Sequence, residues 1–269
     1  NKNVSKFKND AASEFYGAVG YLASLDLLKS DGAIKQTLKP KILFKTAPEH
    51  MKKETGNFYL HNKSIFSLDR LGSSGNMESG TSMTVGFDYE RLNKDKELNF
   101  SIGQIINEKK SNKKMPSSSS LDKRFSDIIG NMKYTNNNNF NLNYNFSLDQ
   151  NYKETNFNKI DAEFYNDHIN FNLKYLDEEK VSSNTEYITS SIELKKGNNG
   201  IFTLSNKRNL ITNSSEYYNL SYEYINDCLR AGLVYRREFY DDSELEAENS
   251  LMFKITLSPF ASLSSPSFN

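Results

Sequence analysis

Large apolar and small polar residues alternate along this chain with a period of two, in short stretches separated by turn residues. In the stretch 141–148 every even position is Leu, Tyr or Phe and every odd position is Asn or Ser. The stretch 168–175 repeats the pattern with the parity reversed. A β-strand points successive side chains to opposite faces, so each stretch predicts a strand with one apolar and one polar face.

The same pattern predicts about a dozen strands from one end of the chain to the other. Most of them have close to the roughly 9–11 residues that a tilted strand needs to cross a bilayer. The predicted strands are 15–26, 37–46, 79–91, 98–105, 127–134, 140–149, 157–165, 168–176, 186–195, 201–207, 216–225, 228–239 and 250–258.

The connections between these strands are of two kinds. Tight turns are predicted at 166–167, 198–200 and 226–227, where Asn, Asp and Gly tolerate a positive φ. Long polar stretches occupy 49–80, 106–126 and 241–249. Short turns on one rim and long loops on the other are typical of bacterial outer-membrane barrels.

Composition decides between this barrel and a soluble sandwich or lipocalin-like barrel. Only 36% of the residues are hydrophobic, yet 13% are aromatic, which argues against both a dense soluble core and disorder. A barrel with a hydrated lumen needs apolar residues on one face only. We therefore predict an all-β, antiparallel transmembrane β-barrel with about 12–13 strands in this chain. Asn141, Asn143, Asn145, Asn170 and Asn172 are expected to face the lumen.

Charge excludes some partners. The chain has 34 basic and 34 acidic residues and a net charge of zero, so we expect no nucleic-acid partner. No stretch is apolar for the roughly 18 residues of a spanning helix. The chain begins with Asn1 rather than Met, and we expect residues 1–269 to be a single outer-membrane domain that forms the C-terminal portion of a longer protein.

Catalytic chemistry has little support in the residues. His50, His61 and His168 lie in or beside predicted loops and have no metal-ligand spacing. An outer-membrane hydrolase remains a possible class, but there is no Gly-x-Ser-x-Gly elbow and only His168 lies near a strand. We expect no catalytic residue, no cofactor and no metal, although the acidic stretch 241–248 could bind a divalent cation at the cell surface.

Five segments in order resemble the LptD family, the LPS-assembly or organic solvent tolerance proteins of the Gram-negative outer membrane. Residues 62–71 with Glu78-Ser79-Gly80-Thr81 resemble its N-L-F-x-L-x-R-x-S-G…E-x-G-T stretch. Residues 101–104 resemble its S-x-G-Q strand and residues 125–130 its S-D-I-V-G strand start. Residues 226–230 resemble its cysteine turn, and residues 250–257 its closing strand.

The resemblance implies a transporter and not an enzyme. It would receive LPS from a periplasmic Lpt bridge, through an N-terminal domain outside this chain, and hold an LptE-like lipoprotein as a plug among outer-membrane lipids. The implied mechanism is lateral opening of the barrel, with Leu251, Phe253, Ile255 and Leu257 on one lip of the gate and pairing that ends or weakens at Pro259. A self-contained porin-like or autotransporter-type barrel of about 12 strands is the alternative.

The only cysteine, Cys228, cannot form a bridge within this chain. Cys228 is either a half-buried thiol at the start of a strand, without a function, or one half of a disulfide to a segment outside the chain. The resemblance implies such a bond to the N-terminal region. The family turn has two adjacent cysteines where this chain has Asp227-Cys228, so a doubled bridge is impossible here.

Overall fold

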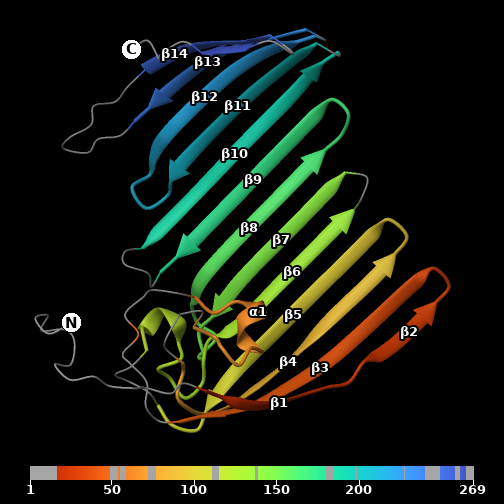
Figure 1. The fold of residues 1–269 in the computed structure, drawn as a ribbon, viewed down its shortest axis with the longest axis vertical. Helices are drawn as coiled ribbons and strands as arrows, with labels where there is room; N and C mark the ends of the chain where they lie inside the picture. The colour runs from red at the N-terminus through yellow and green to blue at the C-terminus, as the bar shows by residue number, and fades with distance from the viewer. Residues whose placement is uncertain are drawn as a thin grey trace, which may run out of the picture.

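The computed structural model describes residues 17–48, 54, 59–71, 77–110, 115–136, 139–179, 184–197, 199–226, 228–239, 249–257 and 261–264, with side chains omitted at 117 and 261–264. Most of these residues belong to one antiparallel sheet of 15 strands (Figure 1). Its strands are β1 (Val19–Ser24), β2 (Leu27–Asp31), β3 (Ile34–Ala47), β4 (Gly80–Asn93), β5 (Lys96–Asn107), β6 (Ile128–Asn136), β7 (Phe140–Leu148), β8 (Thr155–Tyr165), β9 (Ile169–Glu178), β10 (Thr185–Lys196), β11 (Gly200–Asn209), β12 (Ser214–Ile225), β13 (Leu229–Glu238), β14 (Asn249–Leu257) and β15 (Ala261–Ser264). One short helix, α1 (Asn62–Ile65), and one 3-10 turn, η1 (Ser117–Ser119), lie in the connections.

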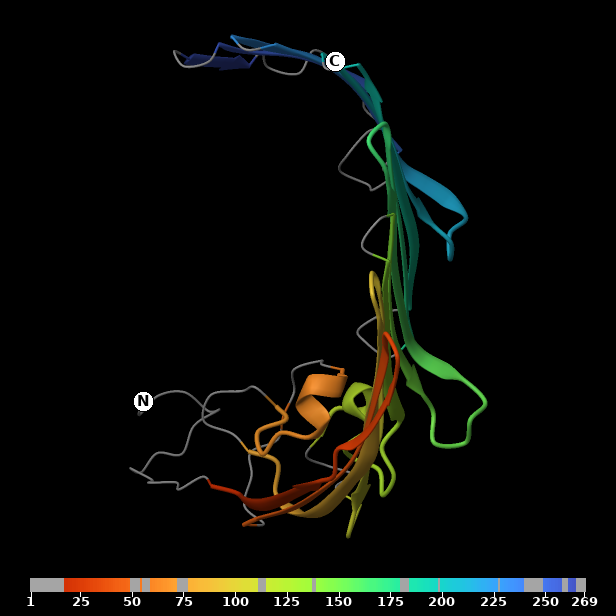
Figure 2. The same cartoon turned by 90° about the vertical axis from the view of Figure 1, so that its right-hand side faces the viewer.

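The strands follow one another across the sheet in chain order. Both β1 and β2 pair with β3, and from β3 to β15 each strand pairs with the next. Within the described residues the first and last strands do not pair with each other, so the sheet is an open arch (Figure 2). Figure 2 places α1 on the concave side of this arch.

The predicted all-β antiparallel class is confirmed, with two more strands than the sequence indicated. β2 was missed because its residues, Leu27-Leu28-Lys29-Ser30-Asp31, do not alternate. β15 was missed because it follows Pro259, where we expected pairing to end or weaken. Each of the thirteen predicted strands overlaps a strand of the sheet.

The two kinds of connection lie at opposite ends of the strands. Short turns, such as those after β4, β8 and β12, lie on one rim, which we call the short-turn rim. The connections that include residues 48–79 and 108–127 lie on the other, the long-loop rim. Turn chemistry fixes the short ones: Asn166 Oδ1, for example, accepts backbone N–H bonds from His168 (2.9 Å) and Ile169 (2.8 Å).

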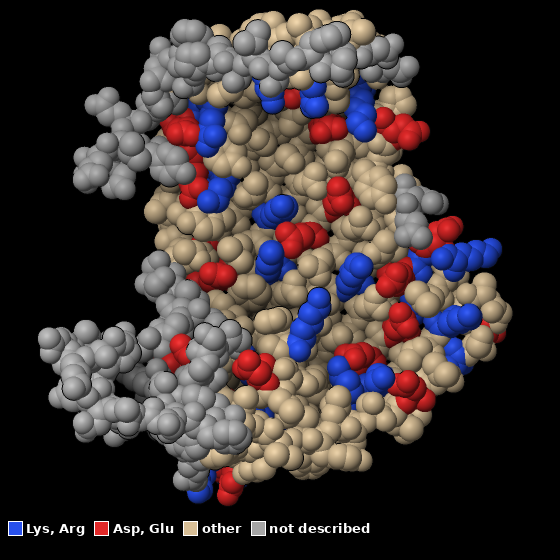
Figure 3. Space-filling view, in the orientation of Figure 1, with Lys and Arg blue, Asp and Glu red and all other residues tan. Residues whose placement is uncertain are grey.

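The strand register keeps the two faces distinct across the whole sheet. On the concave face, which we call the inner face, Asn143 stands opposite Asp161, and Asp161 opposite Lys174. Figure 3 shows basic and acidic side chains interspersed over this face. The convex or outer face instead exposes large apolar side chains, including those of Phe44, Phe87, Phe171, Leu204, Tyr222 and Phe253.

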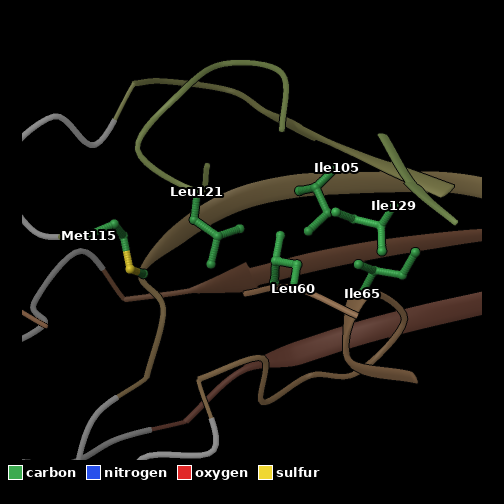
Figure 4. Packing of buried hydrophobic residues seen from close by; sticks show 6 residues of the cluster. All are labelled: Leu60, Ile65, Ile105, Met115, Leu121 and Ile129. Carbon is green, nitrogen blue, oxygen red and sulfur yellow. The ribbon is translucent and has the colours of Figure 1, made fainter. Parts of the chain in front are cut away.

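Among the described residues, the cluster of buried apolar side chains is small. It joins the inner face of β5 and β6 to the connections that fold over it, and its members are Leu60, Ile65, Ile105, Met115, Leu121 and Ile129 (Figure 4). No helix among the described residues is long and apolar enough to span a membrane. The exposed apolar outer face is far more extensive than this core, as expected of a wall whose apolar environment is lipid.

Two adjacent residues of β9 test the assignment of the faces. Leu173 lies on the outer face and Asn172 on the inner face. Leu173→Arg should cost about 2–4 kcal/mol near the bilayer midplane, whereas Asn172→Arg should cost far less because the inner face is hydrated. The folded fraction in outer membranes, measured from heat-modifiable migration on gels, would report this difference. Equal folded fractions would contradict the assignment.

Candidate functional site

Three segments that the sequence singled out converge on the inner face of β3 to β6, near the long-loop rim. Residues 59–71, which we call the inner segment, lie against this wall, and α1 contacts both β5 and β6. The strand segment 101–104 forms part of the wall, and the segment 125–130 enters it at the start of β6. The site is therefore a wall with a connection folded onto it.

Three glycines make room for the inner segment. A Cβ on Gly20 would lie 2.4 Å from the Cδ2 of Leu68, and one on Gly103 would lie 2.6 Å from the Cδ1 of Ile65. A Cβ on Gly86 would lie 3.0 Å from the ring of Phe66. Side chains at these positions would displace the segment from the wall. The glycines of β1, β4 and β5 thus form a cradle for it.

A buried ion triad fixes the far end of the segment. The carboxylate of Glu78 accepts a hydrogen bond from Lys45 Nζ (2.7 Å) and two from Arg70 Nη1 (3.0 and 2.9 Å). These side chains are at most 7% exposed. Arg70 also donates to the hydroxyls of Ser82 (3.0 Å) and Thr84 (2.8 Å). Such pairing is required because an unpaired buried charge costs several kcal/mol, on the order of 3–5.

A second buried network holds the connection between β5 and β6. The Oδ2 of Asp127 accepts hydrogen bonds from Asn156 Nδ2 (2.6 Å) and Ser147 Oγ (3.1 Å). Lys123 lies 3.6 Å from Asp127 Oδ1 and 2.9 Å from Asp149 Oδ1. Partial burial lowers the pKa of Lys123, but the hydrogen bond from Lys123 to Asp149 and the charge of Asp127 outweigh this and raise its pKa above the ordinary value. Lys123 is therefore a permanent cation that ties two connections together.

The predicted lumen-facing asparagines lie on the inner face, as the register of β7 and β9 requires. Asn131 Nδ2 donates to the Oδ1 atoms of Asn143 (2.9 Å) and Asn145 (2.8 Å). Asn141 and Asn172 line one groove of about 350 Å³, and the charged residues of its lining are Lys133, Asp161, Glu163 and Lys174. Asn170 accepts a hydrogen bond from Asn172 (3.2 Å). Amide, carboxylate and ammonium groups thus lie side by side on the inner face.

The predicted gate residues lie on β14, next to last in the sheet. Leu251, Phe253 and Leu257 are 46%, 47% and 45% exposed on the outer face. Ile255 shares this face, opposite Ala231 of β13. On the other side β15 pairs only with Lys254–Leu257. Pro259 lies outside the described residues.

The remaining predicted positions are not brought together. Cys228 is an exposed free thiol in a turn of the short-turn rim, where its N–H donates to Asn226 Oδ1 (3.0 Å). His168 lies in another turn of that rim. His61 caps α1, where Ser64 Oγ donates to the His61 carbonyl (2.9 Å) and lies 3.4 Å from its Nδ1.

No metal site is found in the part of the chain that the structure describes, since no three His, Cys, Asp or Glu side chains come together there. His50 and the acidic stretch 241–248 lie outside the described residues.

The sequence alone did not point to Lys45, Gly20 or Gly86. Lys45 stands at a polar position of an alternating strand and looks like any other inner-face lysine. The only available signal was the resembling segment around Arg70 and Glu78, which marks two charges without naming their partner.

Arg70→Ala should release the inner segment while leaving the sheet folded. The change leaves Lys45 as the remaining cation beside Glu78, and the hydroxyls of Ser82 and Thr84 lose the hydrogen bonds that Arg70 donates to them. We therefore expect the local stability of the inner segment to fall by about 3–5 kcal/mol. Hydrogen exchange in 59–71 of the full-length protein should then rise, with β7–β12 still protected. Lys39→Ala, which breaks the exposed pair between Lys39 and Asp26, should change exchange little. Equal effects of the two variants would contradict the role of the triad.

Among solved structures, a triple mutant of the Rhodopseudomonas blastica porin is 12% identical, with a TM-score of 0.39, covering 92% of this chain and 82% of the porin. Another mutant of that porin is 10% identical, with a TM-score of 0.38 and 93% of each chain covered. No curated protein matches the sequence.

The family described as LPS transport system D, or LptD, matches residues 2–200, which is well over half of the chain and includes the cradle, the triad and the asparagines of β7 and β9. The chain therefore belongs to the LptD family of LPS transport proteins.

Proposed function

We propose that this chain is part of the wall of an outer-membrane barrel that passes LPS through its lumen and releases it sideways into the outer leaflet. The observation that carries this proposal is the two-faced sheet of an LptD-family chain: apolar outside, and amide- and charge-rich inside. LPS has the same division between acyl chains and saccharide. Such a wall would let the acyl chains contact lipid on its outer face while the saccharide stays hydrated on its inner face.

The inner groove supports the saccharide part of this proposal. Its Asn, Asp, Glu and Lys side chains supply both donors and acceptors for sugar hydroxyls. Neighbouring groups of opposite charge leave little net field, so a passing saccharide would meet many weak contacts and no single tight site. Many weak contacts allow the saccharide to move on, as transport requires, whereas a single tight site would retain it.

The inner segment supports lateral exit. Together with the connection that contains η1 it covers the inner face of β3 to β6 at the long-loop rim (Figure 2). That rim is the cell-surface end in bacterial barrels. A narrowed mouth there favours release through the wall over release through the mouth.

β14 is the proposed lip of the gate. Within the described residues its first half, which includes Leu251 and Phe253, pairs only with β13. An edge with so few backbone hydrogen bonds on one side separates at low cost. The exposed apolar side chains of its outer face would guide acyl chains towards lipid as the edge opens.

The partners follow from the same proposal. An LptE-like lipoprotein would occupy the polar lumen, and a periplasmic Lpt bridge would deliver LPS through the N-terminal domain. Cys228, on the short-turn rim, would face the periplasm and could bond to that domain. The location is the outer membrane of a Gram-negative cell, and the reaction breaks no bond.

Photocrosslinking in cells tests passage through the lumen. A photoreactive residue replacing Asn143 or Asn172, in the full-length protein, should crosslink to LPS only while LPS is being supplied. The same residue at Leu173, on the outer face, should crosslink to leaflet LPS whether or not supply continues. If the inner positions yield no LPS adduct while position 173 does, passage through the lumen is excluded.

A reversible disulfide tests the lip. Lys254→Cys with Ser264→Cys should join β14 to β15, whose Cα register pairs these positions, and LPS delivery to the cell surface should fall until reductant is added. Val234→Cys with Met252→Cys is the matched control, because it joins β14 to β13 on the same face. Unchanged delivery in the first variant would place the lip elsewhere.

A further inference from the structure

A pocket of about 320 Å³ opens at the long-loop rim between two connections. Lys110, Lys123, Arg124, Phe125 and Gln150 line it, and we call it the rim pocket. Lys110 follows β5, the three central residues precede β6, and Gln150 belongs to the connection between β7 and β8. Its volume falls in the range of pockets that hold small ligands.

The pocket holds more positive charge than its surroundings neutralise. Of its three cations, Lys123 is paired with Asp149 and Asp127. Lys110 and Arg124 form no ion pair with any of the residues that the structure describes. Two cations are therefore available to an anion.

The backbone of residues 123–125, which supply three of the five lining residues, is held although it lies in a connection. The Arg124 carbonyl accepts a hydrogen bond from Asn107 N (2.7 Å), and the Lys123 carbonyl accepts one from Asn107 Nδ2 (2.8 Å). Asn107 is itself buried. Phe125 forms a bridge with Ile106 of β5. Little ordering is needed on binding, which favours affinity.

Phe125 is the apolar residue of the pocket lining, and it lies at the edge of the outer face. Ile106 stands opposite Met83, whose neighbour across β3 is the exposed Phe44, so this row faces outwards. Phe125, paired with Ile106, is 42% exposed. The available cations thus lie beside an exposed apolar side chain at the long-loop rim.

We propose that the rim pocket binds the phosphate group of a phosphorylated glycolipid whose acyl chains pack on the outer face beside Phe125. Arg124 can donate two parallel hydrogen bonds to phosphate oxygens, and Lys110 adds a point charge. This inference rests on the membrane placement in the proposed function, but not on passage through the lumen. It makes the wall a binding surface for lipid that has already reached the outer leaflet.

Lipid binding by the full-length protein in nanodiscs of phosphatidylcholine tests this proposal. The probes are bisphosphorylated lipid A, lipid A without phosphates, and inorganic phosphate, each counted per protein by native mass spectrometry. The wild type should prefer bisphosphorylated lipid A. Arg124→Gln with Lys110→Gln should weaken that binding roughly tenfold or more, and Arg124→Lys should retain part of it.

The matched control removes two charges from the opposite rim. Lys195→Gln with Lys196→Gln lies at the exposed end of β10 and should leave lipid binding unchanged. All variants should show the same heat-modifiable migration. Equal binding by the two double variants would overturn the proposal, and so would inorganic phosphate that binds as tightly as the lipid.

The outcome is separable from that of the proposed function. Loss of lipid binding with normal crosslinking at Asn143 would support the rim pocket independently of transport. Retained lipid binding with no inner crosslink would reject passage through the lumen and leave the rim pocket standing.

Discussion

The pairing of backbone polar groups between neighbouring strands is the constraint on which this structure depends. In hydrocarbon an unpaired N–H or C=O costs several kcal/mol, so every strand that crosses must be bonded along both edges. An antiparallel sheet meets this demand without help from side chains. The side chains can then be apolar on the face that contacts lipid and polar on the face that contacts water. The low apolar content of 36% follows directly, because only alternate residues need to be apolar.

The same constraint explains where the buried interactions lie. The inner face is mostly polar and offers the inner segment only a few apolar side chains, such as Ile105 and Ile129, so the segment also needs other attachments. Ile65 and Phe66 settle over Gly103 and Gly86, and the triad of Lys45, Arg70 and Glu78 replaces hydration with paired charges. The packing over the glycines requires wall positions without a side chain, and the triad requires wall residues close enough to pair with Arg70. The small core of Figure 4 is therefore the result of the infolded connections and not the source of the sheet's stability.

Much of the fold could be predicted because a period of two survives in nearly every strand. β7 and β9 are the clearest cases, and their inner asparagines lie where the alternation put them. β2 could not be predicted because its five residues do not alternate between apolar and polar. They form a strand because they pair with β3. The triad was equally hidden, since Lys45 and Glu78 are 33 positions apart and no local rule relates them. The resemblance located residues of the site, but their contacts in the folded chain were needed to explain what each of them does.

The meander topology has a consequence for how such a wall is built and varied. Apart from β1, each strand pairs with one directly before or after it in the chain. Outside the long connections 48–79 and 108–127, adding a strand therefore closes only a short loop and costs little chain entropy. The growing edge serves as a template for the next strand. Hairpins can therefore be gained or lost one at a time over evolution without rethreading the chain. The attachments on β1, β3, β4 and β5 are the exception, because a hairpin inserted there would separate the glycines that the inner segment spans.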